Sequence, residues 1–339
     1  MRKIPFTKLN FDKEEEKAVK RCMRSGWVVL GPKTLEFERK FADYVGAKYA
    51  VFVDSGTAAL DLSVKLRLGG AKTVKIPSLT FVSDAEVLVH NGIKPEFVDV
   101  NMKSLCTEIG DNDCIPTNFA GRLADNGNAI IDSCHRIERY DVRNAKNPDS
   151  LWCYSFYATK NMSTVQGGMI AMNDLDAYKW LLMARDHGAT KGTKQRYEGK
   201  NPIYDVEFCG WRVKPDDLRA SIGLVQLEKL PYANARRDEI VKRYNENLGL
   251  DNVGNHIYPV FVDKREEFIH NMLKKRIQTS VHFRPIHTLT AYKEPGVKLK
   301  TTDFIADKIV SLPMFPDMTN ADVDRVSKEV LKTKQLILI

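Results

Sequence analysis

Short apolar segments alternate with helical segments over residues 49–100, and this alternation limits the possible folds more than any other feature of the chain. Segments 49–53, 74–77 and 95–100 are predicted strands, and helical patterns lie between them. A further short strand is predicted at 114–118. Because strands that alternate with helices form βαβ units, we predict an α/β fold built on a mainly parallel sheet.

The length of 339 residues suits a large domain with a smaller second one better than a single small core. The last third of the chain is a mixed succession of strands and helices, including a predicted strand at 279–283. We therefore predict a large domain at residues 1–232 and a smaller C-terminal α/β domain at residues 233–339. Two helices, 215–230 and 233–248, are predicted on either side of that boundary.

Composition argues against several classes of function. Lys and Arg number 52 against 44 Asp and Glu, which gives a net charge of +8, but the basic residues form no stripe suited to a nucleic acid. The excess suits attraction of a small anionic substrate. The sequence has no run of 18 apolar residues to span a membrane and no apolar signal region at its N-terminus, so we expect a cytoplasmic protein.

The cysteines are widely scattered along the chain and none forms a CxxC pair. We therefore predict reduced, packed thiols and neither a zinc site nor any other metal site. The six positions are Cys22, Cys106, Cys114, Cys134, Cys153 and Cys209.

Lys160 ends the aromatic segment that begins at Ser155, and small residues, Gly167-Gly168 and a second apolar segment follow. The pattern predicts strand, turn and strand with Lys160 at the bend. One interpretation is a solvated turn residue. The other is an amine placed for chemistry, because a lysine can form a Schiff base with a carbonyl such as that of pyridoxal phosphate. That interpretation requires an acid for the cofactor's ring nitrogen, a phosphate cradle and an aromatic ring.

A candidate phosphate cradle is Ser55-Gly56-Thr57-Ala58, between a predicted strand and a predicted helix. Free backbone amides at a helix N-terminus bind phosphate, and the hydroxyls of Ser55 and Thr57 would add to them. The alternative is an ordinary helix N-cap, because Ser and Thr are common there.

Asp132 ends a buried apolar strand, and His135 follows three residues later. Proteins of the α/β class place ligand-binding groups at strand ends. A buried carboxylate could hold the proton of the cofactor's ring nitrogen, and His135 could hydrogen-bond the phenolic oxygen. The alternatives are a helix N-cap for Asp132 and a packed side chain for His135.

Phe81 also follows a predicted strand and could stack on a planar ring, although an aromatic residue there is more often part of a core. Thr57, Phe81, Asp132 and Lys160 thus stand at four strand ends, in that order. Together they supply the partners that a Schiff-base lysine requires.

Short motifs extend over nearly the whole chain. Those before the candidate site are Ser25-Gly26-Trp27, Gly31-Pro32, Glu36-Phe37-Glu38 and Gly46-Ala47-Lys48-Tyr49-Ala50. Those at the site are residues 55–60, 77–81, 95–99 and 155–160, and later ones are 185–188, 222–230, 281–287 and 311–313. In these motifs the chain resembles the DegT/DnrJ/EryC1/StrS family of pyridoxal-phosphate sugar aminotransferases.

The resemblance implies an aspartate aminotransferase-like transferase of fold type I, dependent on pyridoxal 5'-phosphate, with a large mixed or mainly parallel sheet. Lys160 would be the Schiff-base lysine that also moves the proton, and Asp132 would pair with the ring nitrogen. His135 would contact the phenolic oxygen and Phe81 would stack on the ring. The residues expected to hold the phosphate are Gly56, Thr57, Ala58 and Ser155.

The resemblance also implies a homodimer with shared active sites. Arg212 or Lys214 of the neighbouring subunit would complete the phosphate cradle, at a place where the family often has asparagine. Gln166 stands where the family usually has glutamate near the nucleotide sugar. Three residues match loops near the family's substrate, with surface or packing roles as the alternative: His187, Arg284 and His287.

The function that the resemblance implies is transfer of an amino group from L-glutamate to a UDP-, dTDP- or GDP-linked keto-sugar. The expected acceptor is C4 of a 4-keto-6-deoxyhexose, in 4-amino-4,6-dideoxy sugar biosynthesis. A 3-keto-sugar or aminocyclitol specificity is the alternative within the family, and a catalytically silent regulatory protein of the same fold is the alternative outside it. Family members with histidine in place of the lysine act as dehydratases, and Lys160 argues against that activity.

Overall fold

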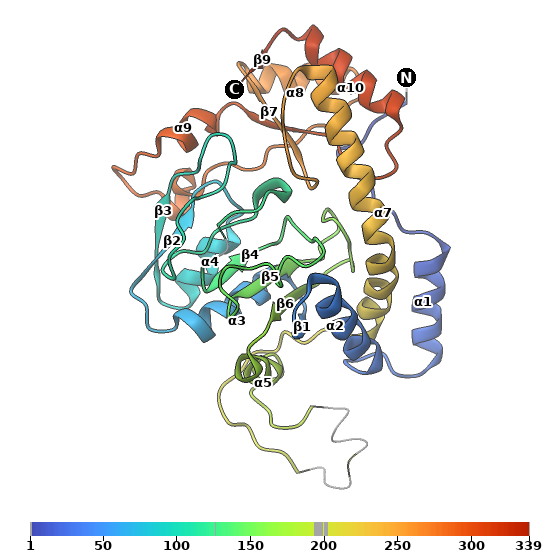
Figure 1. Ribbon diagram of the computed structural model, residues 1–339, viewed down its shortest axis with the longest axis vertical. Coiled ribbons are helices and arrows are strands. Elements are labelled where there is room, and N and C mark those ends of the chain that lie inside the picture. Colours follow the sequence, from blue (N-terminus) through green and yellow to red (C-terminus); the bar gives the residue numbers. More distant parts are fainter. Residues whose placement is uncertain (1, 126, 193–198, 200–202, 339) are drawn as a thin grey trace.

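A mixed sheet with the strand order β1-β6-β5-β4 lies at the centre of the larger part of the molecule (Figure 1). The computed structural model describes residues 2–125, 127–192, 199 and 203–338. The four strands are β1 (Tyr49–Val53), β4 (Ile130–Asp132), β5 (Leu151–Ser155) and β6 (Gly168–Met172). β4 and β5 are parallel, whereas β6 is antiparallel to both β1 and β5. The predicted α/β architecture is confirmed, and its sheet is mixed.

A parallel pair, β2 (Thr73–Pro77) and β3 (Lys94–Val98), extends this arrangement. The segment between β3 and β4 connects the two sheets through single β-bridges, from Cys114 to Lys75 and from Thr117 to Asp132. The regular strand predicted at 114–118 does not form. Pro116 lies between the two bridges, and its lack of a backbone N–H explains why the pairing does not continue through it.

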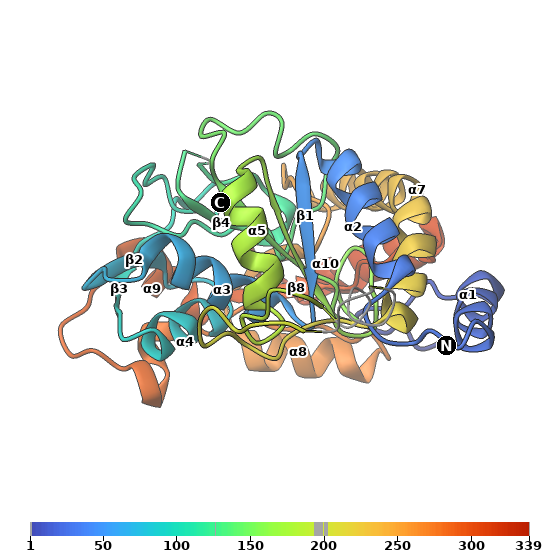
Figure 2. The same ribbon diagram turned by 90° about the horizontal axis from the view of Figure 1, so that it is seen from below.

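Helices cover both faces of the central sheet (Figure 2). α3 (Gly56–Leu68), α4 (Ser83–His90) and α5 (Leu175–Ala184) pack on one side, and α2 (Pro32–Val45) with α7 (Asp217–Leu248) on the other. Successive residues of β1 alternate between the two cores, because neighbouring side chains of a strand point to opposite faces. The sheet is therefore buried on both sides, as its apolar strands require.

The helices predicted at 215–230 and 233–248 are one continuous helix, α7, which contains Pro231. Leu230 and Ala233 are buried on either side of the proline, and this packing holds the helix together through it. In Figure 1, α7 runs from the central sheet to the C-terminal part of the molecule, with α1 (Lys13–Arg24) beside it. The division into domains at residues 232 and 233 stays a prediction.

The C-terminal part contains an antiparallel sheet of order β8-β7-β9, made of β7 (Tyr258–Val262), β8 (Ile309–Leu312) and β9 (Leu336–Ile337). Its helices are α8 (Arg265–Lys274), α9 (Lys300–Ala306) and α10 (Asn320–Lys332). The strand predicted at 279–283 is absent from this sheet, and only Ser280 forms a bridge, to Ser311. Among the described residues, no helix is both long and apolar enough to span a membrane.

Asp217, at the start of α7, caps the N-terminus of a different helix, α2. Its carboxylate accepts hydrogen bonds from the backbone N–H groups of Gly31, Lys33 and Thr34 (each 2.9 Å) and from the Thr34 hydroxyl (2.7 Å). The Asp217 side chain is buried, and Gly31, the N-cap residue of α2, has no side chain that could cap the helix. One carboxylate therefore fixes two helices relative to each other.

We expect Asp217→Ala to lower the free energy of unfolding by about 3 kcal/mol, because it leaves several buried donors without an acceptor. The measurement is denaturant unfolding, with Asp43→Ala as the control. Asp43 forms an exposed ion pair with Arg39, so its loss should change stability by less than about 0.5 kcal/mol. Equal effects of the two substitutions would contradict the capping role.

Candidate active site

A cavity of about 370 Å³ is lined by seven of the predicted cofactor-binding residues, which are Gly56, Thr57, Phe81, Asp132, His135, Ser155 and Lys160. Ser55 and Gln166, which the sequence also singled out, line it as well. A larger hollow of about 580 Å³ beside α1 is lined by residues of α1, α2 and α7 and contains none of them. The chemistry of the side chains, and not cavity size, therefore identifies the candidate site.

Lys160 lies in the turn between β5 and β6, where its backbone N–H donates to the Tyr157 carbonyl (3.0 Å). The side chain is half-buried. Burial lowers the pKa of its amine, and the nearby carboxyls of Asp132 and Asp84 partly oppose that effect. The amine is thereby easier to deprotonate than that of a surface lysine, as a nucleophilic amine requires.

Asp132 ends β4 with its side chain at the cavity wall. One carboxylate oxygen accepts the backbone N–H of Cys134 (3.0 Å). Burial raises the pKa of Asp132, whereas the Cys134 N–H and the Lys160 charge lower it. A cation that enters the cavity would add to those two contributions and favour the ionised carboxylate.

His135 is buried and present as the neutral imidazole, because burial holds its pKa well below the usual range, with the charge of Lys160 acting in the same direction. The Ala120 backbone N–H donates to Nδ1 (3.4 Å), so Nδ1 is the accepting nitrogen and the ring hydrogen is on Nε2. His135 can therefore donate one hydrogen bond from Nε2 to an oxygen of a bound molecule.

Two further histidines at the cavity, His256 and His282, come from the C-terminal part and were missed by the sequence analysis. The His256 ring lies 4.4 Å from that of His135, centroid to centroid, and its Nδ1 is 2.8 Å from the Asn161 amide oxygen. Burial lowers the pKa of His282 to about 4. His282 lies within the family motif 281–287, and this motif could have identified it as a site residue. No sequence pattern distinguishes His256.

The N-terminus of α3 forms a tight cradle of backbone. Ser55 is its N-cap residue, and its hydroxyl accepts the Ala58 N–H (3.1 Å), which occupies that amide. A Cβ on Gly56 would lie 2.8 Å from the Ser155 Cβ, and one on Gly168 would lie 2.2 Å from the Ser55 carbonyl oxygen. Only glycine permits such close contacts at these two positions. The first backbone N–H groups of α3 remain available to bind an anion.

Phe81 is about half exposed at the edge of the cavity, 5.7 Å from the Phe283 ring between centroids. Its ring can thus cover a planar molecule that enters. The cavity combines an anion cradle, a carboxyl, a neutral imidazole donor and a single lysine, with an aromatic ring beside them. These residues fit a phosphorylated aromatic aldehyde such as pyridoxal phosphate.

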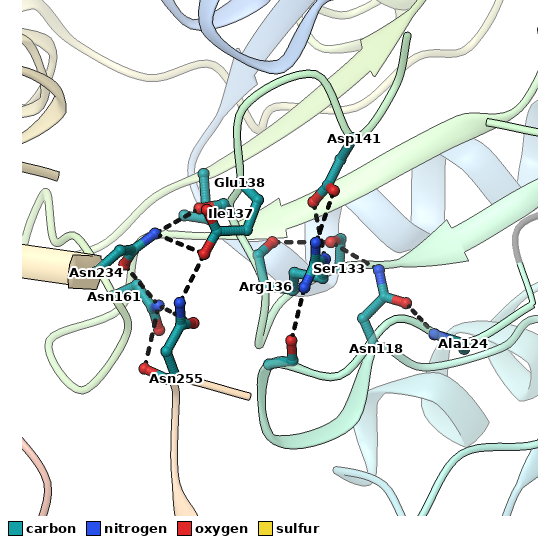
Figure 3. A network of polar contacts seen from close by, with 11 residues as sticks. Asn118, Ala124, Ser133, Arg136, Ile137, Glu138, Asp141, Asn161, Asn234 and Asn255 are labelled. Atoms are coloured by element: carbon teal, nitrogen blue, oxygen red, sulfur yellow. Dashed lines mark hydrogen bonds and ion pairs between the residues drawn. The ribbon is translucent and has the colours of Figure 1, made fainter. Parts of the chain in front are cut away.

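A polar network holds the residue after Lys160 in place (Figure 3). The Asn161 amide nitrogen donates to Asn234 on α7 (3.1 Å) and to Asn255 (3.2 Å). Both of these side chains in turn donate to Glu138, at 3.0 and 2.6 Å. Because the Asn161 nitrogen donates, its amide oxygen is the acceptor for His256, and the turn is joined to α7 and to the C-terminal part.

A second branch of the network holds the segment after Asp132 (Figure 3). Asn118 donates to the Ser133 hydroxyl (3.0 Å), and that hydroxyl donates to the Arg136 carbonyl (2.8 Å). Arg136 forms a two-bond ion pair with Asp141 (2.9 and 3.0 Å). These contacts fix the backbone between Asp132 and His135, and hence the spacing of the two side chains.

The other predicted site residues lie outside this cavity within one chain. Lys214 forms a largely buried ion pair with Asp186 (2.7 Å), whereas Arg212 is exposed. His187 and Arg284 are also exposed. His287 is buried, with Nδ1 2.7 Å from the Ser78 hydroxyl and Nε2 3.0 Å from Asp303. Their roles stay predictions. Among the described residues, no group of three or more His, Cys, Asp or Glu is arranged to hold a metal ion.

The comparison with known families gives one match over most of the chain. Residues 10–111 and 128–331 match the model of the DegT/DnrJ/EryC1/StrS aminotransferase family. A relative with 30% identity is the uncharacterized protein MJ1066 of Methanocaldococcus jannaschii, which matches over 94% of this chain and 94% of its own length. The predicted family resemblance is confirmed, and with it the dependence on pyridoxal phosphate.

Solved structures agree in fold. The PMP-form of a putative sugar aminotransferase, Spr1654 from Streptococcus pneumoniae, superimposes with a TM-score of 0.85 at 23% identity, over 96% of this chain and 98% of that one. Helicobacter pylori PseC, an aminotransferase of pseudoaminic acid biosynthesis, gives 0.86 at 21% identity, over 98% and 99%. The predicted transferase fold of type I is confirmed.

We expect Gly56→Ala to weaken binding of pyridoxal phosphate at least ~10-fold, because the added methyl group forces Ser155 or the cradle to move. Equilibrium dialysis or fluorescence titration of the apoprotein measures this. Gly192→Ala is the control, since no atom of the described residues lies within 4 Å of a Cβ at that position. Unchanged affinity for Gly56→Ala would show that the cradle does not hold the phosphate.

Proposed function

This chain belongs to the DegT/DnrJ/EryC1/StrS family of pyridoxal-phosphate-dependent sugar aminotransferases, and we propose that it transfers the amino group of L-glutamate to a nucleotide-linked keto-sugar. The acceptor in this proposal is C4 of an NDP-4-keto-6-deoxyhexose. The observation that carries it is the lysine with a lowered pKa, Lys160, in one cavity with Asp132, His135 and the cradle at Gly56.

Lys160 acts in two ways in this proposal. Its neutral amine, which burial favours, would hold the cofactor by condensing with its aldehyde, with loss of water. As a free amine, Nζ would carry the proton between the substrate carbon and the carbon on the other side of the transferred nitrogen. When bound, pyridoxal phosphate supplies an aldehyde that condenses with amines and a ring that accepts the electron pair of the substrate carbon.

Asp132 and His135 keep the ring in its reactive state in this proposal. The Asp132 carboxylate holds a proton on the ring nitrogen, which increases the ring's capacity for electrons. His135 donates from Nε2 to the phenolic oxygen, and the Ala120 N–H fixes this tautomer by donating to Nδ1. Phe81 covers the ring, and the N-terminal amides of α3 hold the phosphate together with Ser155.

The proposal includes a homodimer in which each cradle is completed by the neighbouring subunit. Of the two candidate cations, Lys214 is engaged by Asp186 (2.7 Å), whereas Arg212 is exposed on the surface. We therefore assign the contact with the neighbour's phosphate to Arg212. The guanidinium group also suits phosphate better than an ammonium does, because it can form two parallel hydrogen bonds.

The net charge of +8 supports an acceptor that carries a diphosphate. Exposed His187 and Arg284 are the residues we assign to that acceptor. His287 has both ring nitrogens occupied, by Ser78 and Asp303, so we assign it a packing role in the free protein. A 3-keto-sugar is the second candidate acceptor, and the panel below separates the two.

We expect purified protein incubated with L-glutamate to aminate one member of a panel of UDP-, dTDP- and GDP-4-keto-6-deoxy sugars, detected by mass spectrometry. Borohydride should trap pyridoxal phosphate on Lys160, and Lys160→Ala should lose the adduct and lower the rate by ~10⁴-fold or more. Protein that takes up the cofactor but aminates no keto-sugar would favour the regulatory alternative. A product aminated at C3 would overturn the C4 assignment.

Mixing inactive variants tests the shared site. Dimers re-formed from equal amounts of Lys160→Ala and Arg212→Ala should recover about one quarter of wild-type activity, because half of the dimers are mixed and each has one intact site. The matched control, Lys160→Ala mixed with Asp132→Asn, removes two groups of the same subunit and should recover none. Recovery in neither mixture would argue against a contribution of Arg212 across the interface.

A further inference from the structure

Asp84, in the first turn of α4, is a second fully buried carboxyl beside the candidate site, and none of the roles above uses it. Its Oδ2 accepts hydrogen bonds from the hydroxyls of Thr80 (2.9 Å) and Thr117 (3.0 Å). Its Oδ1 is buried and has no hydrogen-bond partner among the described residues. A buried carboxylate oxygen without a donor is costly, so the charge state of Asp84 requires an explanation.

Asp84 is structurally connected to Asp132. Thr80 lines the cavity, and Thr117 forms the parallel β-bridge with Asp132. The hydroxyls of Thr80 and Thr117 are also 3.2 Å apart, so the two threonines and Asp84 form one cluster. The titratable groups that face Asp84 are Asp132 on β4, Cys153 on β5 and Lys160 in the turn after β5.

Of the two carboxyls, that of Asp132 has the better environment for a negative charge. Asp132 accepts a backbone N–H and reaches the cavity, whereas Asp84 accepts only two hydroxyls and is sealed from solvent. Burial, together with the charge of Asp132, raises the pKa of Asp84 well above its usual range, although both hydroxyls oppose this. Because Oδ2 accepts both hydroxyl protons, the proton of a neutral Asp84 resides on Oδ1.

We propose that Asp84 is a positioning residue that stays protonated and, through Thr80 and Thr117, forms an uncharged support for Asp132. The two carboxyls then carry one negative charge, located on Asp132. This inference rests on the proposed pairing of Asp132 with the cofactor's ring nitrogen, which needs one carboxylate for one proton. A second charge would also stabilise the ammonium form of Lys160 and suppress its nucleophilicity.

The protonation state can be tested on the apoprotein with Asp84→Asn, a neutral substitution of the same shape. In the unfolded chain an aspartate has a pKa of about 3.9. If the folded protein keeps the Asp84 proton at higher pH, it binds one proton more than the unfolded chain, so the free energy of unfolding of wild type falls as pH rises. Asp84→Asn has no proton to lose at this position, so its free energy of unfolding does not fall in this way. We expect its Tm, relative to wild type, to be several degrees higher at pH 8 than at pH 5.

Asp43→Asn is the matched control for this measurement, since Asp43 is exposed and its relative Tm should not change over the same range. If Asp84 were ionised when folded, Asp84→Asn would destabilise the protein without any gain between pH 5 and pH 8. That result would overturn the proposal, and it does not depend on cofactor binding.

The positioning role is tested on the holoenzyme by the pH midpoint of the cofactor's visible absorbance. Asp84→Val removes the hydrogen bonds to Thr80 and Thr117 and should weaken cofactor binding ~10-fold, and Asp84→Asn should restore most of it. The midpoint should move by less than ~0.3 pH unit in Asp84→Asn, because no charge is lost. A downward shift of about one unit would identify Asp84 as an anion and overturn the proposal.

The two proposals fail in different ways. If wild-type protein took up no pyridoxal phosphate, the proposed function would fail, whereas the dependence of Tm on pH would still decide the state of Asp84. If wild type bound the cofactor and Asp84→Asn and Asp84→Val behaved like wild type, Asp84 would have no positioning role.

Discussion

The arrangement of the candidate site depends on the close backbone contact between Gly168, the first residue of β6, and Ser55 before α3. The antiparallel pairing of β1 with β6 places Val53 opposite Gly168, so the phosphate cradle and the turn with Lys160 meet at the same edge of the sheet. No side chain fits between them. The positions of cradle and lysine are thereby set by backbone geometry, which varies less than side-chain conformation.

Around that contact, burial has the largest effect on the pKa values of the ionisable side chains. It lowers the pKa values of Lys160, His135 and His256 and raises those of Asp132 and Asp84. In each case burial disfavours the charged form, and for Asp132 the Cys134 N–H and the Lys160 charge oppose this effect. Opposite charges on a bound molecule would therefore stabilise the ionised forms that burial disfavours.

Much of the site could be predicted because its residues lie at strand ends, where the sequence pattern itself changes. Lys160, Asp132, Phe81 and Gly56 each follow an apolar run, and all four line the cavity. His256 could not be found in this way, because it reaches the cavity from the C-terminal part, about 120 residues along the chain from His135. Only a three-dimensional fold brings such residues together.

The errors in the predicted elements have a similar origin. The segment 279–283 has strand-like composition, but the sheet edge offers it only one bridge, and the segment 114–118 is interrupted by Pro116. The two helices predicted at 215–230 and 233–248 are one helix, which tertiary packing keeps continuous through Pro231.

The continuity of α7 has a mechanical consequence. The helix begins at the Asp217 cap, carries Asn234 in the network that holds Asn161, and reaches the C-terminal core, where the Tyr244 hydroxyl donates to the Pro313 carbonyl (2.9 Å). This single helix passes residue 232 without interruption, and its Pro231 is the place where it can bend most easily. Because Asn234 lies just after that proline, a bend there would reach the turn of Lys160 through Asn161.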